Sequence, residues 1–298
     1  MASWDGAVVS EARITDYDSI ADRFDARYDL CDYAGVRETV LNFLGDAAVA
    51  VLEVGCGTGH WLGAIQARRT PSPYNTVSPS PDHTDDTRSS SRSAKASAER
   101  RVLAGIDPSA PMLARARGAA PAARLVRARA EDLPWRDGSF DRVFCVNALH
   151  HFTDRNRFFA EARRVLKPGG GLLTIAKDPH GERDAWWVYD YFEETRDIDL
   201  ARYARVKTLR GELARAGFAW AESFEADHIE AVHPAGAALA DGADGPLARS
   251  FTSQLTVLSD EEFARGIARI REANAAAGGE LQLVADFRLY ATVGWLQP

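Results

Sequence analysis

Three glycines at alternate positions form the motif in this chain with the clearest chemical role. Gly55, Gly57 and Gly59 directly follow the apolar residues 51–54, which predict a buried strand. Glycine permits positive φ and lets the backbone approach a ligand without a Cβ in the way. The apolar residues after the glycines suit a helix whose N-terminus points at that ligand. Strand, glycine turn and helix together predict the nucleotide-binding corner of a doubly wound sheet.

The spacing of the glycines separates the classes of nucleotide loop. A dinucleotide-binding loop requires G-x-G-x-x-G, but position 60 is His60 and the pattern here is G-x-G-x-G. The loop also lacks a Gly-Lys-Ser/Thr ending, which excludes a P-loop. The remaining alternatives are a different cofactor loop and a merely tight strand-to-helix turn.

An acid at the end of the second strand is the partner expected for such a loop, because it binds ribose hydroxyls. Residues 102–106 predict that strand, and Asp107 ends it. Asp107 lies 48 residues after Gly59 (107 − 59), because residues 67–100 are dominated by Ser, Thr, Pro and charge. That composition predicts a disordered insertion in a surface connection. A plain helix cap is the alternative role of Asp107.

The segment Glu53-x-Gly55-x-Gly57-x-Gly59 resembles motif I of class I S-adenosylmethionine-dependent methyltransferases. Further segments resemble the same family: D-x-S-x-x-M-L from residue 107, A-E-D-L-P-W from 130, N-A-L-H-H-F from 147 and R-V-L-K-P-G-G from 164. The resemblance covers about residues 17–177, and within the family the chain resembles the small-molecule, quinone-biosynthesis type. Arg129 stands where the family has an acid, which leaves Glu131 and the Ala130 amide as candidates at the adenine. The resemblance implies S-adenosyl-L-methionine as cofactor and a binding set of Glu53, Gly55, Cys56, Gly57, Gly59, Asp107, Pro108, Met112, Ala130, Glu131 and Asn147.

Candidate groups for the reaction itself are histidines and aromatic residues. If the acceptor is a hydroxyl, a general base is needed, and the nearest candidates in sequence are His150, His151 and His180. Adjacent histidines are not expected to project the same way, so no metal site is expected, and a structural role stays open for both. Helical spacing over residues 17–28 and an aromatic run at 184–192 predict walls of an acceptor pocket, or packed helix faces. The proposed acceptor contacts are Tyr17, Tyr28, Trp186 and Trp187.

Composition restricts the partners. The net charge of −7 argues against nucleic acid, because phosphate binding needs clustered Lys and Arg. There is no run of 18 apolar residues and no secretory pattern at the N-terminus, so we expect no membrane span and a cytoplasmic protein. Cys31, Cys56 and Cys145 have no metal-binding spacing. The sequence leaves the oligomeric state open.

We therefore expect a single methyltransferase domain over residues 1–298. Its fold is α/β, a doubly wound, seven-stranded, mostly parallel sheet of the Rossmann-like methyltransferase type with helical cap insertions. Residues 16–66 and 101–177 form the cofactor-binding core, 67–100 the disordered insertion, and 178–298 the substrate cap and closing strands. The expected reaction is methyl transfer to a small-molecule acceptor. The alternatives are a catalytically silent cofactor-binding or partner-binding protein of this fold, and a protein or nucleic-acid methyltransferase.

Overall fold

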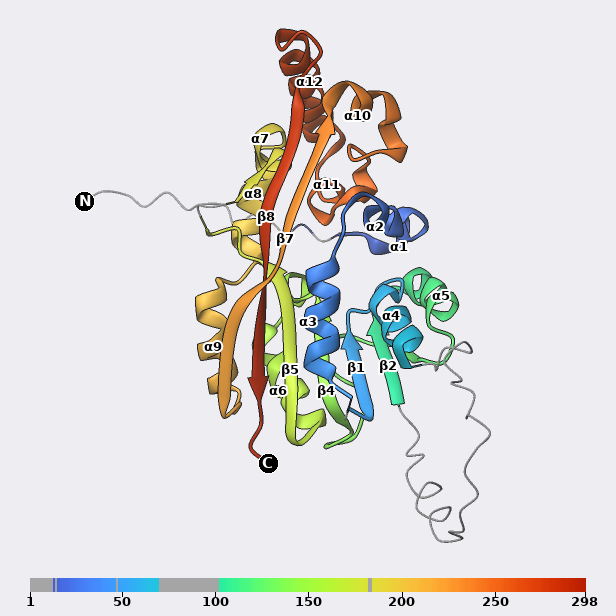
Figure 1. The fold of residues 1–298 in the computed structure, drawn as a ribbon, viewed down its shortest axis with the longest axis vertical. Coiled ribbons are helices and arrows are strands. Elements are labelled where there is room, and N and C mark those ends of the chain that lie inside the picture. The colour runs from blue at the N-terminus through green and yellow to red at the C-terminus, as the bar shows by residue number, and fades with distance from the viewer. Residues whose placement is uncertain (1–12, 14, 47, 70–101, 182–183) are drawn as a thin grey trace, which may run out of the picture. The chain divides into compact units, whose positions relative to one another are not determined.

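The computed structural model describes residues 13, 15–46, 48–69, 102–181 and 184–298 (Figure 1). These residues form two compact units. The larger unit comprises Tyr33–Ala176, Val206–Asp227 and Leu289–Pro298. The smaller unit comprises the described residues up to Asp32, with Lys177–Arg205 and His228–Arg288. Of the predicted insertion 67–100, residues 67–69 belong to a helix, and residues 70–100 lie outside the described residues.

The larger unit is built on a parallel sheet. Its strands follow the order β3 (Arg124–Arg127), β2 (Val102–Asp107), β1 (Ala50–Val54), β4 (Phe140–Val146) and β5 (Leu166–Lys177). Leu52 at the centre of β1 pairs with Ala104 on one side and Val143 on the other. All five residues of β1 are buried, as a strand covered on both faces requires. The strand order reverses between β1 and β4, and such a switch point is where doubly wound sheets bind ligands.

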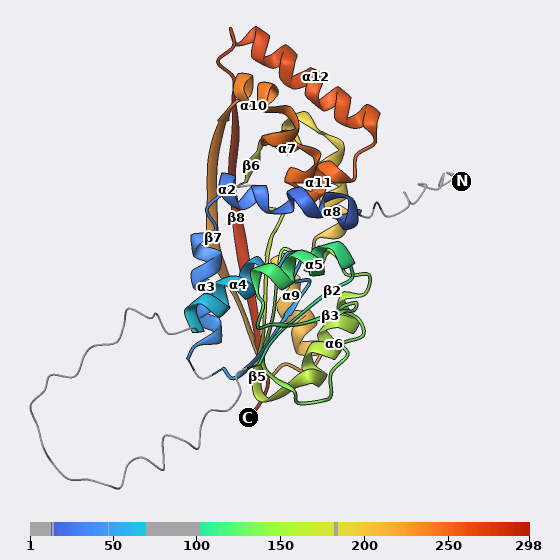
Figure 2. The same cartoon turned by 90° about the vertical axis from the view of Figure 1, so that its right-hand side faces the viewer.

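Helices cover both faces of this sheet (Figures 1 and 2). On one face lie α3 (Ala34–Leu44), α4 (His60–Arg69) and α5 (Ala110–Ala119), and on the other lie α6 (Arg155–Val165) and α9 (Val206–Arg215). The apolar stripe Trp61, Leu62 and Ile65 holds α4 on the sheet. Beyond β5 comes β8 (Gln282–Trp295), and β7 (Trp220–Pro234) pairs with β8 in the opposite direction.

The smaller unit has its own apolar core. The chain enters it as three short turns: α1 (Tyr17–Ile20), η1 (Ala21–Ala26) and α2 (Arg27–Leu30). Then come β6 (Ala185–Trp186), α7 (Trp187–Tyr191), α8 (Glu194–Arg202), α10 (Ala235–Asp241), η3 (Gly242–Asp244), η4 (Arg249–Phe251), α11 (Ser253–Thr256) and α12 (Asp260–Ala276). Their buried side chains form one cluster that includes Trp187, Phe192 and Ile270. The sequence encodes the start of α12 as a capping box between Ser259 and Glu262.

The predicted fold class is confirmed, with two corrections of detail. The described sheet has eight strands rather than seven, because the two-residue β6 pairs antiparallel with β8 at Ala185 and Asp286. The expected single helix over residues 17–28 is broken into α1, η1 and α2. One cause is local: Arg27 Nε donates to the Phe24 carbonyl at 2.9 Å, the acceptor that an α-helix gives to the amide of residue 28. No helix of the described residues combines the length and apolar character needed to cross a membrane.

Candidate functional site

The loop between β1 and α4 lies where β1, β2 and β4 end. Gly55, Gly57 and Gly59 all have positive φ, at 74°, 51° and 83°. A Cβ on Gly55 would lie 2.6 Å from the Ala148 Cβ, so the chain can pass the end of β4 only as glycine. The amides of Gly55 and Cys56 both donate to the Ile106 carbonyl, at 2.9 and 2.8 Å. The glycines therefore form a narrow backbone cradle pinned to β2.

Asp107 ties this cradle to the second strand. Its Oδ2 accepts a hydrogen bond from the Gly57 amide and its Oδ1 one from the Ser109 amide, both at 2.9 Å. The side chain is 8% exposed, so both amides are held away from bulk water. Asp107 is not the cap of α5, because Ser109 Oγ accepts from the Met112 amide and caps that helix. A carboxylate accepts hydrogen bonds only, which is the chemistry that ligand hydroxyls need.

Glu53 is the penultimate residue of β1, just before the cradle, and is 1% exposed. Its Oε2 is buried and has no hydrogen-bond partner among the described residues. Burial raises the pKa of Glu53 well above its usual range, and the neighbouring Asp107 carboxylate adds to the rise. An unpaired buried carboxylate is costly, so a positively charged ligand group beside it would stabilise the site. Burial and the two acids also raise the pKa of Cys56, whose thiol therefore stays protonated.

The ends of β2 and β3 carry the other predicted cofactor residues. Met112 is buried in the packing of α5, and the Pro108 carbonyl accepts a hydrogen bond from Arg127 Nε at 2.8 Å. Ala130 is 5% exposed. Glu131 Oε1 accepts from the amides of Thr153 and Asp154, at 2.6 and 3.2 Å, ahead of α6.

Arg129, the departure from the family pattern, adds to this arrangement. Its Nε lies 3.5 Å from Glu131 Oε2, and its Nη2 donates to Thr153 Oγ1. The Glu131 side chain thus accepts hydrogen bonds from amides at the start of α6 and pairs with Arg129. Contact of the Ala130 backbone or of Glu131 with an adenine stays a prediction.

Asn147 follows β4 at the same edge of the sheet. It is the one non-glycine residue with positive φ (49°) in the part of the chain that the structure describes. Its amide donates to the Ile175 carbonyl at 2.8 Å, which anchors the turn to β5. Residues other than glycine are strained in this backbone conformation, and such strain is concentrated at functional sites.

The two histidines after Asn147 lie together. Their ring centroids are 3.9 Å apart, so the expectation that they project apart is wrong. The reason is that Leu149–His151 form a 3₁₀ turn (η2), whereas neighbouring side chains alternate only in a strand. His150 is 9% exposed and His151 is half-buried. No group of three or more His, Cys, Asp or Glu side chains able to hold a metal ion occurs within the described residues.

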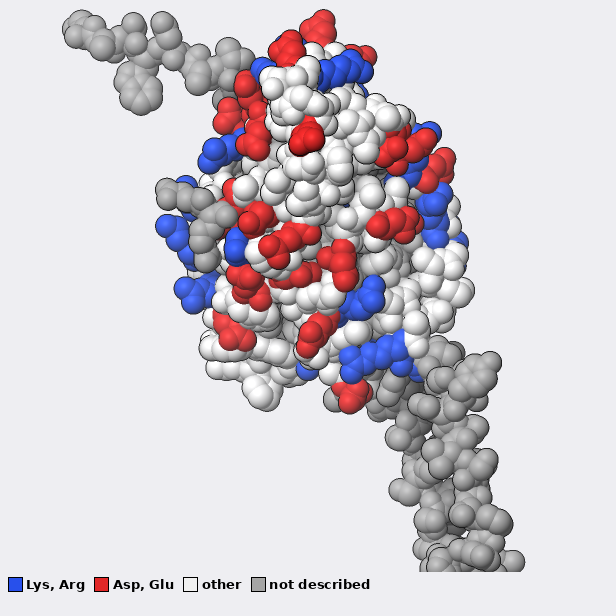
Figure 3. Space-filling view, turned by 45° about the horizontal axis from the view of Figure 1, so that its top comes forward, with Lys and Arg blue, Asp and Glu red and all other residues white. Residues whose placement is uncertain are grey.

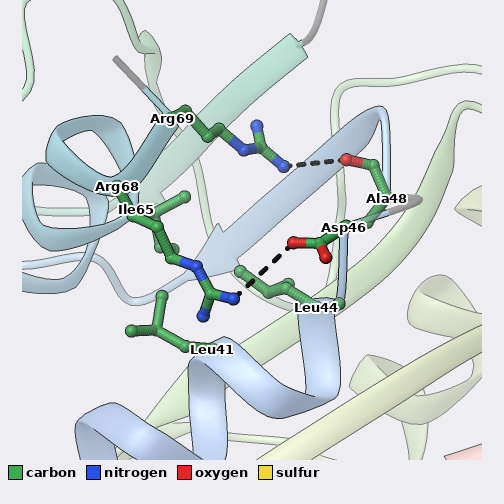
Figure 4. Close-up of a pocket in the computed structure, with 8 residues that line it drawn as sticks. Leu41, Leu44, Asp46, Ala48, Ile65, Arg68 and Arg69 are labelled. Carbon is green, nitrogen blue, oxygen red and sulfur yellow. Dashed lines mark hydrogen bonds and ion pairs between the residues drawn. The ribbon is translucent and has the colours of Figure 1, made fainter. Parts of the chain in front are cut away.

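The pocket in Figure 4 lies at the opposite end of β1 from the glycine cradle. Leu41, Leu44 and Ile65 line it, and two arginines of α4 close it. Arg69 Nη2 donates to the Ala48 carbonyl at 3.0 Å, and Arg68 pairs with Asp46 at 3.6 Å. These internal pairings make it a packing gap between α3 and α4.

The four predicted acceptor contacts and the third candidate histidine belong to the smaller unit. Tyr17 and Tyr28 are half-buried in the short N-terminal turns. Trp186 and Trp187 are 6% and 1% exposed and belong to the apolar core of that unit. His180 Nε2 donates to the Tyr203 carbonyl at 3.0 Å, since a carbonyl oxygen can only accept. Contact of any of these residues with an acceptor stays a prediction.

The smaller unit also holds a buried charge cluster that motif reasoning missed. Lys177, the last residue of β5, pairs with Asp199 of α8 at 2.6 Å, and Arg202 pairs with the same carboxylate at 2.7 Å. A basic residue directly after an otherwise apolar strand was the available signal in the sequence. Asp199 gave no signal, because it sits among other acids in a charged helix.

Comparison with known sequences supports the family. Residues 89–174 match the model of a family described as a methyltransferase domain. This match overlaps β2 to β5, including Asp107, Glu131 and Asn147. Residues 89–174 thus carry a methyltransferase domain. The family predicted from the sequence is thereby confirmed.

Two curated relatives resemble parts of the methyltransferase domain. A phthiotriol/phenolphthiotriol dimycocerosates methyltransferase of Mycobacterium ulcerans is 46% identical over 66 residues, which is 22% of this chain and 24% of the relative. The ubiquinone/menaquinone biosynthesis C-methyltransferase UbiE of Acidiphilium cryptum is 34% identical over 113 residues, 30% of this chain and 44% of that protein. The chain thus matches about a quarter of the length of the mycobacterial relative.

Solved structures share the fold of the chain. A protein of Anabaena variabilis, described as a methyltransferase of an antibiotic biosynthesis pathway, superposes with a TM-score of 0.59 at 16% identity. The match covers 86% of this chain and 95% of that one. Phospholethanolamine N-methyltransferase 2 of Haemonchus contortus, solved with S-adenosylhomocysteine, gives a TM-score of 0.50 at 14% identity, covering 96% of this chain and 61% of that one. At these identities the likeness shows the fold of the methyltransferase domain and no more.

Proposed function

We propose that the protein transfers a methyl group from S-adenosylmethionine to a small-molecule acceptor. The observation that carries the proposal is the hydrogen bond from the Gly57 amide to Asp107 Oδ2, which joins the positive-φ glycine cradle to the acid of β2. The residues present fit this cofactor on three grounds. The cradle admits a ligand against the backbone, Glu53 offers a buried unpaired carboxylate oxygen, and Asp107 is a carboxylate, the acceptor that ribose hydroxyls need.

The chemistry divides between the cofactor and the chain. S-adenosylmethionine supplies a sulfonium methyl group that is activated toward displacement. In the proposed arrangement, the amides of the glycine cradle hold the methionine end beside Glu53. Asp107 accepts from the ribose hydroxyls, and the Ala130 backbone lies at the adenine. By fixing the donor, these residues leave the enzyme to align an acceptor lone pair behind the methyl group, and such alignment supplies roughly 7–11 kcal/mol.

A small-molecule acceptor is favoured over a polymer. The curated relatives are named as methyltransferases of phthiotriol/phenolphthiotriol dimycocerosates and of ubiquinone/menaquinone biosynthesis. On the face shown in Figure 3, acidic side chains gather in the middle of the described surface and basic ones lie nearer its edges. Together with a net charge of −7, this opposes the clustered Lys and Arg that phosphate backbones require.

The identity of the general base is part of the proposal. His150 and His151 follow β4 at the edge of the sheet where the cradle lies, which keeps them as candidates. His180 is the weaker candidate, because its Nε2 proton is already donated to the Tyr203 carbonyl. A carbon acceptor activated by its own ring needs less help from a base than an alcohol does.

A two-step assay tests the function. Calorimetry with S-adenosylhomocysteine is expected to show one binding site. The full chain is then incubated with S-adenosylmethionine and a panel of quinols, phenols and aliphatic alcohols, and products are read by mass. An acceptor-dependent gain of one methylene mass with release of S-adenosylhomocysteine supports the proposal. Cofactor binding without transfer to any class of acceptor favours the catalytically silent alternative, and transfer to added protein or nucleic acid favours the polymer alternative.

A further inference from the structure

Asp199 is the centre of a buried polar network in the smaller unit. It is fully buried, and both of its oxygens accept from several donors. Oδ2 accepts from Lys177 Nζ at 2.6 Å and from the Tyr189 hydroxyl at 2.7 Å. Oδ1 accepts from Arg202 Nη2 at 2.7 Å, and the Gln254 amide reaches both oxygens at 3.1 and 2.8 Å. The carboxylate is thus saturated.

Aromatic rings enclose the lysine of this network. Lys177 Nζ lies 3.9 Å from the centroid of the Trp186 ring, 4.6 Å from that of Tyr189 and 5.4 Å from that of Tyr203. The Lys177 side chain is 7% exposed. Ring faces stabilise the ammonium group and keep it in place, but they carry no formal negative charge.

The charges of the network do not balance. Lys177 and Arg202 supply two positive charges and Asp199 one negative charge. A further acid that acts on Lys177 is Asp184, and Arg288 already engages it: the Arg288 amide donates to Asp184 Oδ1 at 3.3 Å, with Nη1 3.7 Å from the same oxygen. One positive charge is therefore left over in a buried place, where an uncompensated charge is expensive.

The surplus is localised on Arg202. Its Nη2 donates to Asp199, whereas its Nε and Nη1 are buried and have no hydrogen-bond partner among the described residues. The Arg202 side chain as a whole is 13% exposed. A guanidinium with unused donors and an excess of charge is the arrangement that proteins use for carboxylates and phosphates.

We propose that Arg202, backed by Lys177, forms a subsite for the anionic group of a small organic ligand, a carboxylate or a phosphate. A single anion there neutralises the surplus charge and accepts from a guanidinium donor that is otherwise unpaired. The smaller unit contains the predicted acceptor residues, so the natural occupant is an acidic group of the methyl acceptor. That last identification rests on the proposed function, whereas the anion subsite does not.

The test measures thermal unfolding of the full chain without cofactor at constant ionic strength. Chloride is replaced stepwise by acetate in one arm and by inorganic phosphate in the other. An anion present at about ten times its dissociation constant for the native state is expected to raise Tm by about 3–6 °C. A rise in acetate alone assigns a carboxylate, and a rise in phosphate alone assigns a phosphate.

Variants separate the subsite from general salt effects. Arg202→Lys keeps a charge that can pair with Asp199 but removes the unused guanidinium donors, and it is expected to weaken anion binding about tenfold. Arg202→Gln is the second variant, in case the first does not fold. Arg196→Gln changes an exposed arginine of the same helix and is the matched control, in which the rise in Tm is retained.

The outcomes decide between the subsite and a closed structural cluster. A rise in Tm that wild type and Arg196→Gln show and that both Arg202 variants lose supports the subsite. An equal rise in all four proteins, or none in wild type, overturns it. Binding of S-adenosylhomocysteine is measured separately, so loss of the proposed function leaves this result readable on its own.

Discussion

Replacing Asp107 separates its two roles, because the structure shows one and the proposed function requires the other. The carboxylate accepts from the Gly57 and Ser109 amides, both at 2.9 Å, in a side chain that is 8% exposed. Asp107→Asn keeps one acceptor oxygen and leaves one of these amides without a partner. An unsatisfied buried donor costs about 1–3 kcal/mol, so Tm is expected to fall by roughly 2–12 °C.

The same substitution removes a charged acceptor for the ribose hydroxyls. Hydrogen bonds to charged groups contribute about 1.5–3 kcal/mol, so the affinity for S-adenosylhomocysteine is expected to fall roughly 10- to 150-fold. Asp107→Ala leaves both amides unpaired and is expected to lose more stability with a similar loss of affinity. Calorimetry is run well below the Tm of each variant, so that unfolding does not contribute to the measured heat.

Ser109→Ala is the matched control for Asp107. It removes the cap that accepts from the Met112 amide at 3.2 Å and costs about 1 kcal/mol of stability. It lowers Tm while leaving the affinity for S-adenosylhomocysteine within about twofold of wild type, because Ser109 Oγ faces its own helix. If Asp107→Asn loses stability but binds S-adenosylhomocysteine like wild type, Asp107 is a tether of the glycine cradle and not a ribose ligand.

Three further substitutions test other parts of the account. Burial raises the pKa of Glu53 well above 4.5, so the folded chain loses stability relative to the unfolded chain as pH rises past 4.5. Glu53→Gln removes this loss, and urea unfolding is expected to show that it is more stable than wild type at pH 7 and equally stable near pH 4. The same variant is expected to bind S-adenosylhomocysteine about tenfold more weakly. Asn147→Ala is expected to lose about 1 kcal/mol of stability at its positive φ and Asn147→Gly is not, so wild-type cofactor affinity in Asn147→Gly with weaker binding by Asn147→Ala would show that backbone conformation alone matters there. Burial lowers the pKa of Lys177 from 10.5 to about 8. Between pH 8 and 10.5 the unfolded chain still binds the proton that the folded chain has lost, so the stability of wild type relative to Lys177→Met is expected to rise over this range. A stability difference between the two proteins that does not change with pH contradicts the burial of the lysine as a cation.

The cofactor loop could be predicted because its chemistry is local in sequence. The glycines need positive φ where the chain passes Ala148, and glycine is the residue that adopts it without strain. Asp107 was found despite the long gap before it, because an acid directly after a buried strand is a signal that survives an insertion. Asp141 has a structural role that is not local in sequence, since its Oδ2 accepts from the Val49 and Ala50 amides at the start of β1.

The smaller unit could not be predicted to the same depth, because its contacts join segments far apart in the chain. Asp199 meets Lys177 and Gln254 through the packing of α8 against α11, which no periodic pattern encodes. The aromatic run around Trp187 gave two equal interpretations, an acceptor wall or a packed face. Its 1% exposure within the apolar cluster favours the packed face, and Trp186 lies over Lys177.

A crystal structure of the full chain with S-adenosylhomocysteine tests whether the glycine cradle and Asp107 hold S-adenosylmethionine. The methionine end of the ligand is expected to lie against the backbone of Gly55–Gly59, with its amino group beside Glu53. The ribose hydroxyls are expected within hydrogen-bond distance of the Asp107 carboxylate, and the adenine beside Ala130. Density for the ligand at any other place, or ribose hydroxyls bound by residues other than Asp107, would contradict the account.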